Sequence, residues 1–131
     1  ILEHVRRLAR HCNARLVLIH VADGWAARNF NALQLRESEE MREDREYLDG
    51  VCAELNAEGI ETEALLASGD PAAEITAAAD RERCDLIAMA THGHRLFADM
   101  FYGSVASSVR HQSRVPVLMV RGAAPAGPGA P

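Results

Sequence analysis

The sequence has few of the features that would point directly to a function. Cysteine occurs only three times, at Cys12, Cys52 and Cys84, an odd number without the close spacing of a disulfide framework. Each cysteine lies within or beside an apolar pattern, so we expect small buried side chains and a reducing compartment. The apolar runs are far shorter than the roughly 20 residues that span a bilayer, and no secretory leader is visible. These absences predict a cytoplasmic protein.

A clustered basic surface is missing as well. The 14 basic residues are dispersed among 19 acidic ones, and the formal net charge is -5. Since a nucleic-acid backbone requires a concentrated positive surface, this distribution argues against nucleic acid as a partner. What remains is ordinary for a globular protein, with 48% hydrophobic and 25% charged residues. A chain of 131 residues can bury a core and suits a single domain.

Hydrophobic periodicity predicts alternating helices and strands along the chain. We expect helices at residues 1–12, 32–58, 71–83 and from Gly103 onward, and strands at residues 16–21, 61–66, 85–90 and 117–120. Asn13 and Gly59 are suited to end the first two helices, and Asp70 followed by Pro71 is suited to begin the third. Residues 122–131 contain only glycine, alanine and proline, which predicts a flexible tail.

This alternation is typical of a parallel sheet with helices on both faces and right-handed crossovers. In such folds the ligand binds beyond the carboxyl ends of the strands, where the strand order reverses. The loops that follow Val21 and Ala90 are therefore the places where we expect a site.

The loop between Met89 and Ser104 carries the most chemistry. Gly93, just after a strand, lets the backbone approach a ligand without a side chain in the way. Gly103 at the beginning of a helix exposes first-turn N–H groups, where the helix dipole favours an anion, and Ser104 adds a hydroxyl donor. Arg95 could add a mobile positive charge. Two interpretations stay open on these residues alone, a cradle for a nucleotide phosphate or a plain helix entry. The loop is neither a Walker motif nor a GxGxxG fingerprint, and no lysine lies near it.

Residues 85–121, with the sequence DLIAMATHGHRLFADMFYGSVASSVRHQSRVPVLMVR, resemble the carboxyl-terminal half of the universal stress protein A family. Nucleotide-binding members of that family carry Gly-x-x-Gly, nine residues, and then Gly-Ser or Gly-Thr. Gly93 matches the second glycine, and Gly103 with Ser104 matches the final pair at the same spacing. The segments LARHCNARLVLIHV and ASGDPAAEI resemble earlier parts of the family in the same order, so the resemblance covers all but the tail.

The resemblance implies a three-layer α/β/α sandwich with an open, mainly parallel, five-stranded sheet, of the adenine-nucleotide alpha-hydrolase-like type. Residues 1–121 would form this domain. It also implies ATP or a related adenine nucleotide as the ligand, with magnesium as a companion of ATP. Val21 would line the adenine pocket, with Met89 and Ala90 nearby. The residues implied at the ribose and phosphates are Gly93, Gly103, Ser104 and Val105, with Arg95 as an additional charge.

Two departures from the family pattern bear on this site. Ala90 stands where the family has its first motif glycine, and alanine is the smallest replacement. The family's first strand and the Asp-containing loop after it, which usually holds adenine and ribose, have no counterpart in this sequence. We expect that segment to lie outside the printed sequence, because the loss of a central strand should badly destabilise the sheet.

Three functions follow from the resemblance. The first is a regulatory module of the stress response that binds nucleotide, shifts its conformation and works as a homodimer through an edge strand at Val117–Val120. The second is a stress-response dimer that has lost nucleotide binding, as Ala90 suggests, and works through protein contacts. The third, an enzyme such as a slow ATP hydrolase, ranks last, because no acidic pair for magnesium and no partnered general base are visible. We therefore predict no catalytic residue.

Two further sites are disfavoured. His92 and His94 form a His-x-His pair, but no acidic or cysteine residues with metal-ligand spacing lie beside them. Nothing around Ser104 suggests a strained nucleophile elbow, which argues against a catalytic triad. His20 is assigned no role beyond packing or solvent contact.

Overall fold

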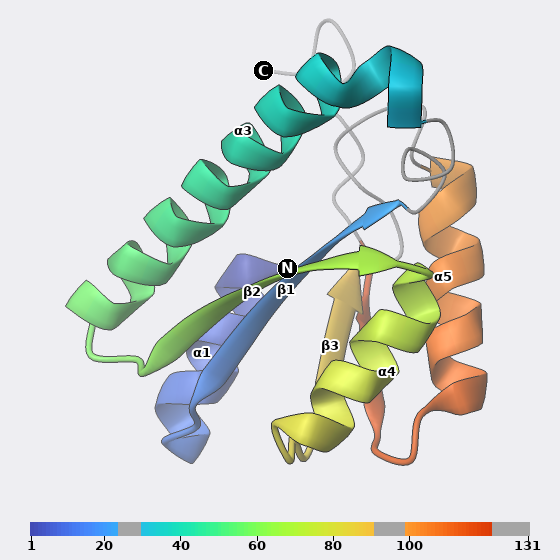
Figure 1. The fold of residues 1–131 in the computed structure, drawn as a ribbon. Coiled ribbons are helices and arrows are strands. Elements are labelled where there is room, and N and C mark those ends of the chain that lie inside the picture. Colours follow the sequence, from blue (N-terminus) through green and yellow to red (C-terminus); the bar gives the residue numbers. More distant parts are fainter. Residues whose placement is uncertain (24–29, 91–98, 122–131) are drawn as a thin grey trace, which may run out of the picture.

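The computed structural model describes residues 1–23, 30–90 and 99–121, in which helices and strands alternate as expected (Figure 1). The helices are α1 (Leu2–Cys12), α3 (Phe30–Ala57), α4 (Pro71–Arg81) and α5 (Asp99–Gln112). The strands are β1 (Leu16–Asp23), β2 (Thr62–Gly69), β3 (Ile87–Ala90) and β4 (Val117–Val120). The predicted boundaries agree to within a few residues except at the beginning of α5. The predicted tail lies outside the described residues.

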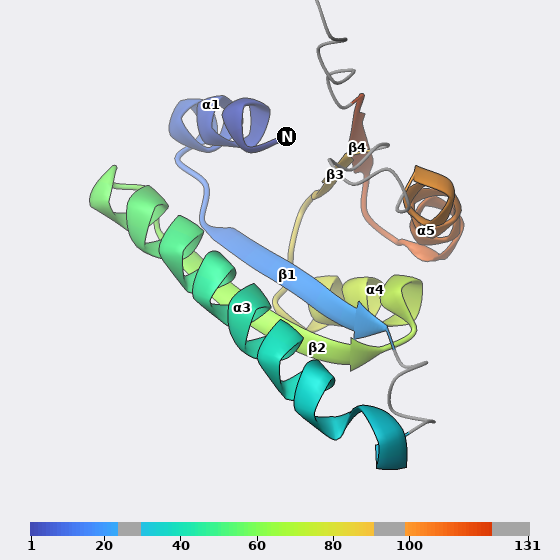
Figure 2. The ribbon, with the colours of Figure 1, turned by 90° about the horizontal axis from the view of Figure 1, so that it is seen from above.

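The strands form two parallel pairs. β1 pairs with β2 from Leu16 opposite Thr62 to Asp23 opposite Gly69, and β3 pairs with β4 from Ile87 to Ala90. β3 and β4 lie beyond β1 on the side away from β2 (Figure 2). The predicted parallel arrangement is confirmed, but the described residues contain four strands in two separate sheets. The five-stranded sheet therefore stays a prediction.

Helices cover both faces of the strands (Figure 2). On one face, α1 and α3 pack on β1 through a buried cluster made of Ala9, Leu55 and Ile60, joined by Leu16, Leu18 and Val51. On the other face, α4 and α5 pack through a second cluster made of Ala72, Ala79, Ile87 and Val109, joined at its rim by partly buried residues that include Met89 and Val105. Burial of apolar surface on both sides stabilises the three layers, and the predicted α/β/α architecture is confirmed.

The predicted helix ends are confirmed in detail. Asn13 ends α1 in the left-handed conformation, with φ 50° and ψ 45°. Asp70 caps α4, and its carboxylate accepts a hydrogen bond of 2.9 Å from the Ala73 N–H. Pro71 occupies the first helical position, where no backbone donor is needed. Gly59 follows the end of α3 with φ +86°, a backbone conformation that residues other than glycine rarely adopt.

The expectation of buried cysteines is wrong for Cys12, which is exposed at the end of α1, while Cys52 and Cys84 are intermediate. The physical reason is that α1 buries only Ala9, so its last residue faces solvent. Burial raises the pKa of the Cys84 thiol, nearby Arg15 opposes this rise, and Glu82 and Asp85 add to it.

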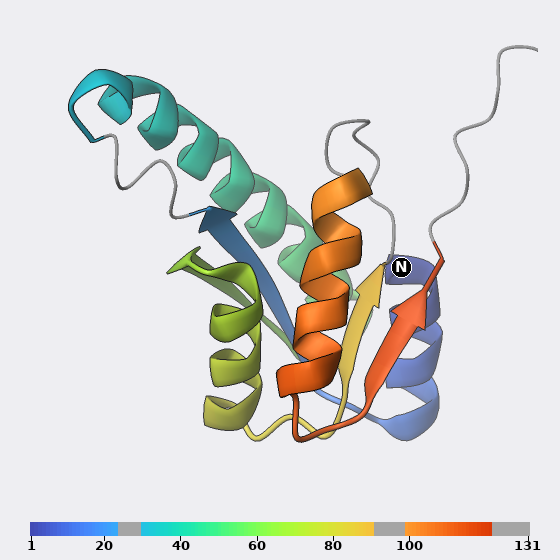
Figure 3. The ribbon, with the colours of Figure 1, turned by 90° about the vertical axis from the view of Figure 1, so that its right-hand side faces the viewer.

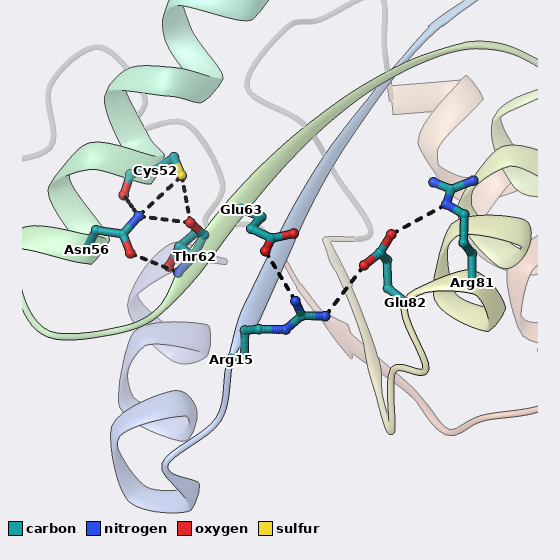
Figure 4. Close-up of polar contacts among 7 residues, drawn as sticks. All are labelled: Arg15, Cys52, Asn56, Thr62, Glu63, Arg81 and Glu82. Carbon is teal, nitrogen blue, oxygen red and sulfur yellow. Dashed lines mark hydrogen bonds and ion pairs between the residues drawn. The ribbon is translucent and has the colours of Figure 1, made fainter.

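Ion pairs tie the elements together at the amino ends of the strands (Figure 4). Arg15, just before β1, reaches Glu63 of β2 at 3.2 Å and Glu82 at the end of α4 at 3.5 Å. On α1, Arg6 donates to Glu54 of α3 at 2.9 Å. These side chains are partly exposed, so each pair contributes modestly and fixes position more than stability. Within the described residues, no helix is both long and apolar enough to cross a membrane.

Candidate functional site

The carboxyl ends of the strands and the beginning of α5 lie at the same end of the molecule (Figures 1 and 3). β1 ends at Asp23 and β3 ends at Ala90. α5 follows β3 in the chain, and its amino terminus lies near the edge where the strands end (Figure 3). This is the edge at which parallel α/β folds place their ligands. The fold therefore brings the two predicted loop positions to one edge.

The structure places the predicted strand residues of the site as follows. Val21 is half-buried near the end of β1, and Met89 and Ala90 are half-buried at the end of β3. Met89 packs against the buried cluster that also receives Val105 from α5. Two predicted site residues from different elements thus meet the same core, which fixes the position of α5 relative to β3.

The prediction that Gly103 and Ser104 begin the last helix is wrong, because α5 begins at Asp99. Residues 99–102 contain neither proline nor glycine, so nothing in the chain stops the helix from starting a turn earlier. A glycine inside a helix costs only about 1 kcal/mol relative to alanine, and the helix runs through Gly103. The N–H groups that lack intrahelical partners therefore belong to the turn before Gly103.

Gly103 nevertheless leaves the flank of α5 open. Apart from its chain neighbours and the backbone of its own helix, no heavy atom of the described residues lies within 4 Å of the Cβ position that a side chain here would have. Gly103 and Ser104 are both exposed, and Val105 is half-buried beside them. A ligand group could therefore approach the helix backbone along this side, close to the positive end of the helix dipole.

Other predicted residues cannot be placed. Gly93 and Arg95, and the His92 and His94 pair, lie outside the described residues. Among the residues that the structure describes, no group of three or more histidine, cysteine, aspartate or glutamate side chains could hold a metal ion. The thiol of Cys84 has a raised pKa, but it does not lie in this candidate site. Cys84 comes before the amino end of β3, whereas Ala90 is at the carboxyl end of the same strand.

One polar contact near this edge was missed from the sequence. The Nε2 atom of His20 on β1 lies 2.9 Å from the Oδ2 atom of Asp44 on α3, and both side chains are 40% exposed. His20 precedes Val21, so its side chain points to the opposite face of β1. The pair joins the end of β1 to α3. Strand alternation in the sequence predicts which face of β1 His20 takes, but it does not predict its partner. His20 and Asp44 are too far apart in the chain for a local pattern to connect them.

Parallel strands between helix layers, with a helix beginning at the carboxyl edge, define an α/β protein of the Rossmann-like type. The sequence profile described as the universal stress protein family matches residues 1–121. The chain belongs to this family.

Two curated relatives are similar over part of their length. The Thermus aquaticus protein named universal stress protein in QAH/OAS sulfhydrylase 3′ region is 36% identical over 88 residues, covering 67% of this chain and 58% of its own. Universal stress protein MJ0577 of Methanocaldococcus jannaschii is 30% identical over 79 residues, covering 60% of this chain and 49% of its own. The matches thus span only about half of these relatives.

Solved structures share the fold. A universal stress protein from Archaeoglobus fulgidus in complex with dAMP has a TM-score of 0.65 at 22% identity, covering 90% of this chain and 82% of that one. A universal stress protein family protein from Arabidopsis thaliana with AMP bound has a TM-score of 0.59 at 22% identity, covering 99% and 80%. At these identities the likeness concerns the fold.

Proposed function

We propose that this chain binds ATP or a related adenine nucleotide at the carboxyl edge of its strands. Adenine would lie toward Val21, and Met89 and Ala90 would border it. The phosphates would lie along α5 at Gly103 and Ser104, completed by Gly93 and Arg95. The observation that carries this proposal is the open flank at Gly103, which lies in the amino-terminal half of a helix facing the carboxyl edge.

The fold likeness favours an adenine nucleotide over other anions, because the relatives described above were solved with dAMP and AMP. Magnesium would enter only with the phosphates of ATP, since the described residues offer no metal cluster of their own. We assign the chain a regulatory role in the stress response rather than an enzymatic one. Nucleotide occupancy would shift a conformation that partner proteins recognise. A cytoplasmic location stays the prediction made from the sequence.

We further propose that the chain works as a homodimer through β4. The Ile87 N–H donates to the Pro116 carbonyl at 3.0 Å, so in this parallel pair the N–H of Met119 points away from β3. Leu118 and Met119 are each 37% exposed. An exposed apolar edge strand favours pairing with a second copy. Met119→Pro removes one outward donor without touching the ladder to β3, so sedimentation should find a smaller mass for it than for the wild type.

A second candidate is a stress-response dimer that does not bind nucleotide. It is favoured by Ala90, whose methyl group stands at the end of β3 where the family pattern has glycine. In that case protein contacts alone would carry the function.

Calorimetric titration with ATP separates the two candidates. The wild type should bind, and Gly103→Val should weaken binding by at least about tenfold, because the new side chain fills the approach to α5. Gly50→Val is the matched control, since Gly50 also lies inside a helix, and no described atom outside its chain neighbours and its own helix backbone is within 4 Å of its Cβ position. Equal binding by the two variants would contradict the phosphate site. A wild type that takes up no ATP would favour the second candidate.

A further inference from the structure

The outer edge of β2, on the side away from β1, carries half of that strand's backbone groups. The Leu16 N–H donates to the Glu61 carbonyl at 2.8 Å, while Leu16 stands opposite Thr62 in the register. In a parallel pair the backbone groups of successive residues alternate in direction. The N–H and C=O groups of Thr62, Ala64 and Leu66 therefore point to the outer edge of β2. Such an edge is a template for another strand.

The first position of this edge is occupied by a side chain. The amide nitrogen of Asn56 donates to the Thr62 carbonyl at 2.8 Å, and its amide oxygen accepts from the Thr62 N–H at 3.0 Å. These are the two hydrogen bonds that a neighbouring strand would make with Thr62 (Figure 4). The Cys52 thiol also lies 3.0 Å from the Thr62 carbonyl oxygen. Thr62 is 5% exposed, so these bonds are shielded from water.

Asn56 is held in place by its own helix. Its amide nitrogen also donates to the Cys52 carbonyl at 2.9 Å, one turn earlier in α3. The Gly59 N–H donates to the Asn56 carbonyl at 2.9 Å, which fixes the turn that leads into β2. The Asn56 amide is thus held by α3 on one side while it pairs with β2 on the other. Because α3 already restricts this side chain, its pairing with Thr62 costs little further side-chain entropy.

We infer that Asn56 closes the outer edge of β2 against strand pairing by a second copy of this chain. A second copy of β2 would have to take the position of the Asn56 amide to pair with Thr62. The middle of β2, with Ala64, Leu65 and Leu66, is apolar and half-buried, so pairing between two copies would otherwise be favourable. The inference concerns β2 alone and does not depend on nucleotide binding or on pairing through β4.

Sedimentation over a range of protein concentrations tests this inference. Asn56→Ala removes both bonds to Thr62, and its mass at high concentration should rise to at least about twice that of the wild type, as expected for an opened edge. Glu54→Ala is the matched control, because it removes one contact of the same helix, to Arg6, and leaves Thr62 closed. A second change, Ala64→Pro, removes an outward N–H without breaking the ladder to β1. Adding it to Asn56→Ala should restore the wild-type mass.

Circular dichroism establishes that each variant is folded. A folded Asn56→Ala protein with the wild-type mass at every concentration would overturn the inference. So would association that Ala64→Pro does not reverse, or that Glu54→Ala shows equally. If Asn56→Ala unfolds, Asn56→Asp takes its place under the same criteria, because it keeps the acceptor for the Thr62 N–H but cannot donate to the carbonyl. A monomeric wild type would double its mass on pairing through β2, whereas a β4 dimer, with one opened β2 edge on each subunit, would associate further.

Discussion

The Ile60 N–H donates to the Leu55 carbonyl at 3.0 Å across Gly59, and the two side chains are buried together at 4% and 1% exposure. This bond, with the one from Gly59 to Asn56, forms a Schellman motif and its usual apolar contact. Gly59→Ala should lower the free energy of unfolding by about 1 kcal/mol, because alanine is strained at φ +86°. Urea unfolding measures the change, and an unaltered midpoint would contradict this account.

Gly50 and Gly103 should respond in the opposite direction. Both lie inside helices with free space around the Cβ position, so alanine adds helix propensity without a clash. Each Gly→Ala change should raise the free energy of unfolding by about 0.5 to 1 kcal/mol. Urea midpoints of the two variants provide the measurement. A destabilised Gly103→Ala protein, next to a stabilised Gly50→Ala protein, would mean that the surroundings of α5 are more crowded than the described residues indicate.

Asp70 should contribute to stability as the cap of α4. Asp70→Ala leaves the Ala73 N–H without its carboxylate acceptor and should lower the free energy of unfolding by about 1 kcal/mol. Asp70→Ser keeps an oxygen acceptor and should retain most of the stability. Thermal unfolding of the two variants compares them, and equal losses would show that the bond to Ala73 is not the cause.

Cys84 should make stability depend on alkaline pH. Burial raises its pKa in the folded protein, so the unfolded chain releases the thiol proton first as the pH rises. The stabilisation is complete below the ordinary thiol pKa and is lost as the pH rises through the folded value. The stability advantage of the wild type over Cys84→Ala should therefore shrink with rising pH in urea unfolding experiments. The serine of Cys84→Ser does not ionise in this pH range either, so the difference in stability between the wild type and this variant should shrink in the same way. A difference that stays constant with pH for both variants would contradict the prediction.

Much of the fold could be predicted because its signals are local. Asn13, Gly59 and Asp70 are read from their own neighbours, since a cap needs only the few residues around it. The apolar run that begins at Leu16 predicts a strand covered on both sides. The cluster of α1 and α3 covers one side of β1, and α4 packs against the other.

What could not be predicted depends on distant contacts. Asn56 and Thr62 meet because the α3 turn brings a side-chain amide onto a strand edge, and a single asparagine carries no periodic signal. The beginning of α5 was misplaced because Gly103 was taken as a boundary, although one glycine is a weak helix breaker. For the site, the sequence predicted that the strands containing Val21 and Ala90 end near these residues, and the structure agrees. Ligand binding at this edge stays a prediction, and Gly93 and Arg95 lie outside the residues that the structure describes.

The pairing of β1 with β2 and of β3 with β4 has a consequence for how the molecule opens. β1, α3 and β2 follow one another in the chain, and so do β3, α5 and β4, while α4 alone connects the two groups. Each group closes its own ladder from neighbouring segments, so each is a natural unit of cooperative local opening. In hydrogen exchange the paired amides of β1 and β2 should therefore lose protection together, and so should those of β3 and β4. The unit that contains α5 also contains the proposed phosphate site, so a bound nucleotide would slow exchange in that unit first.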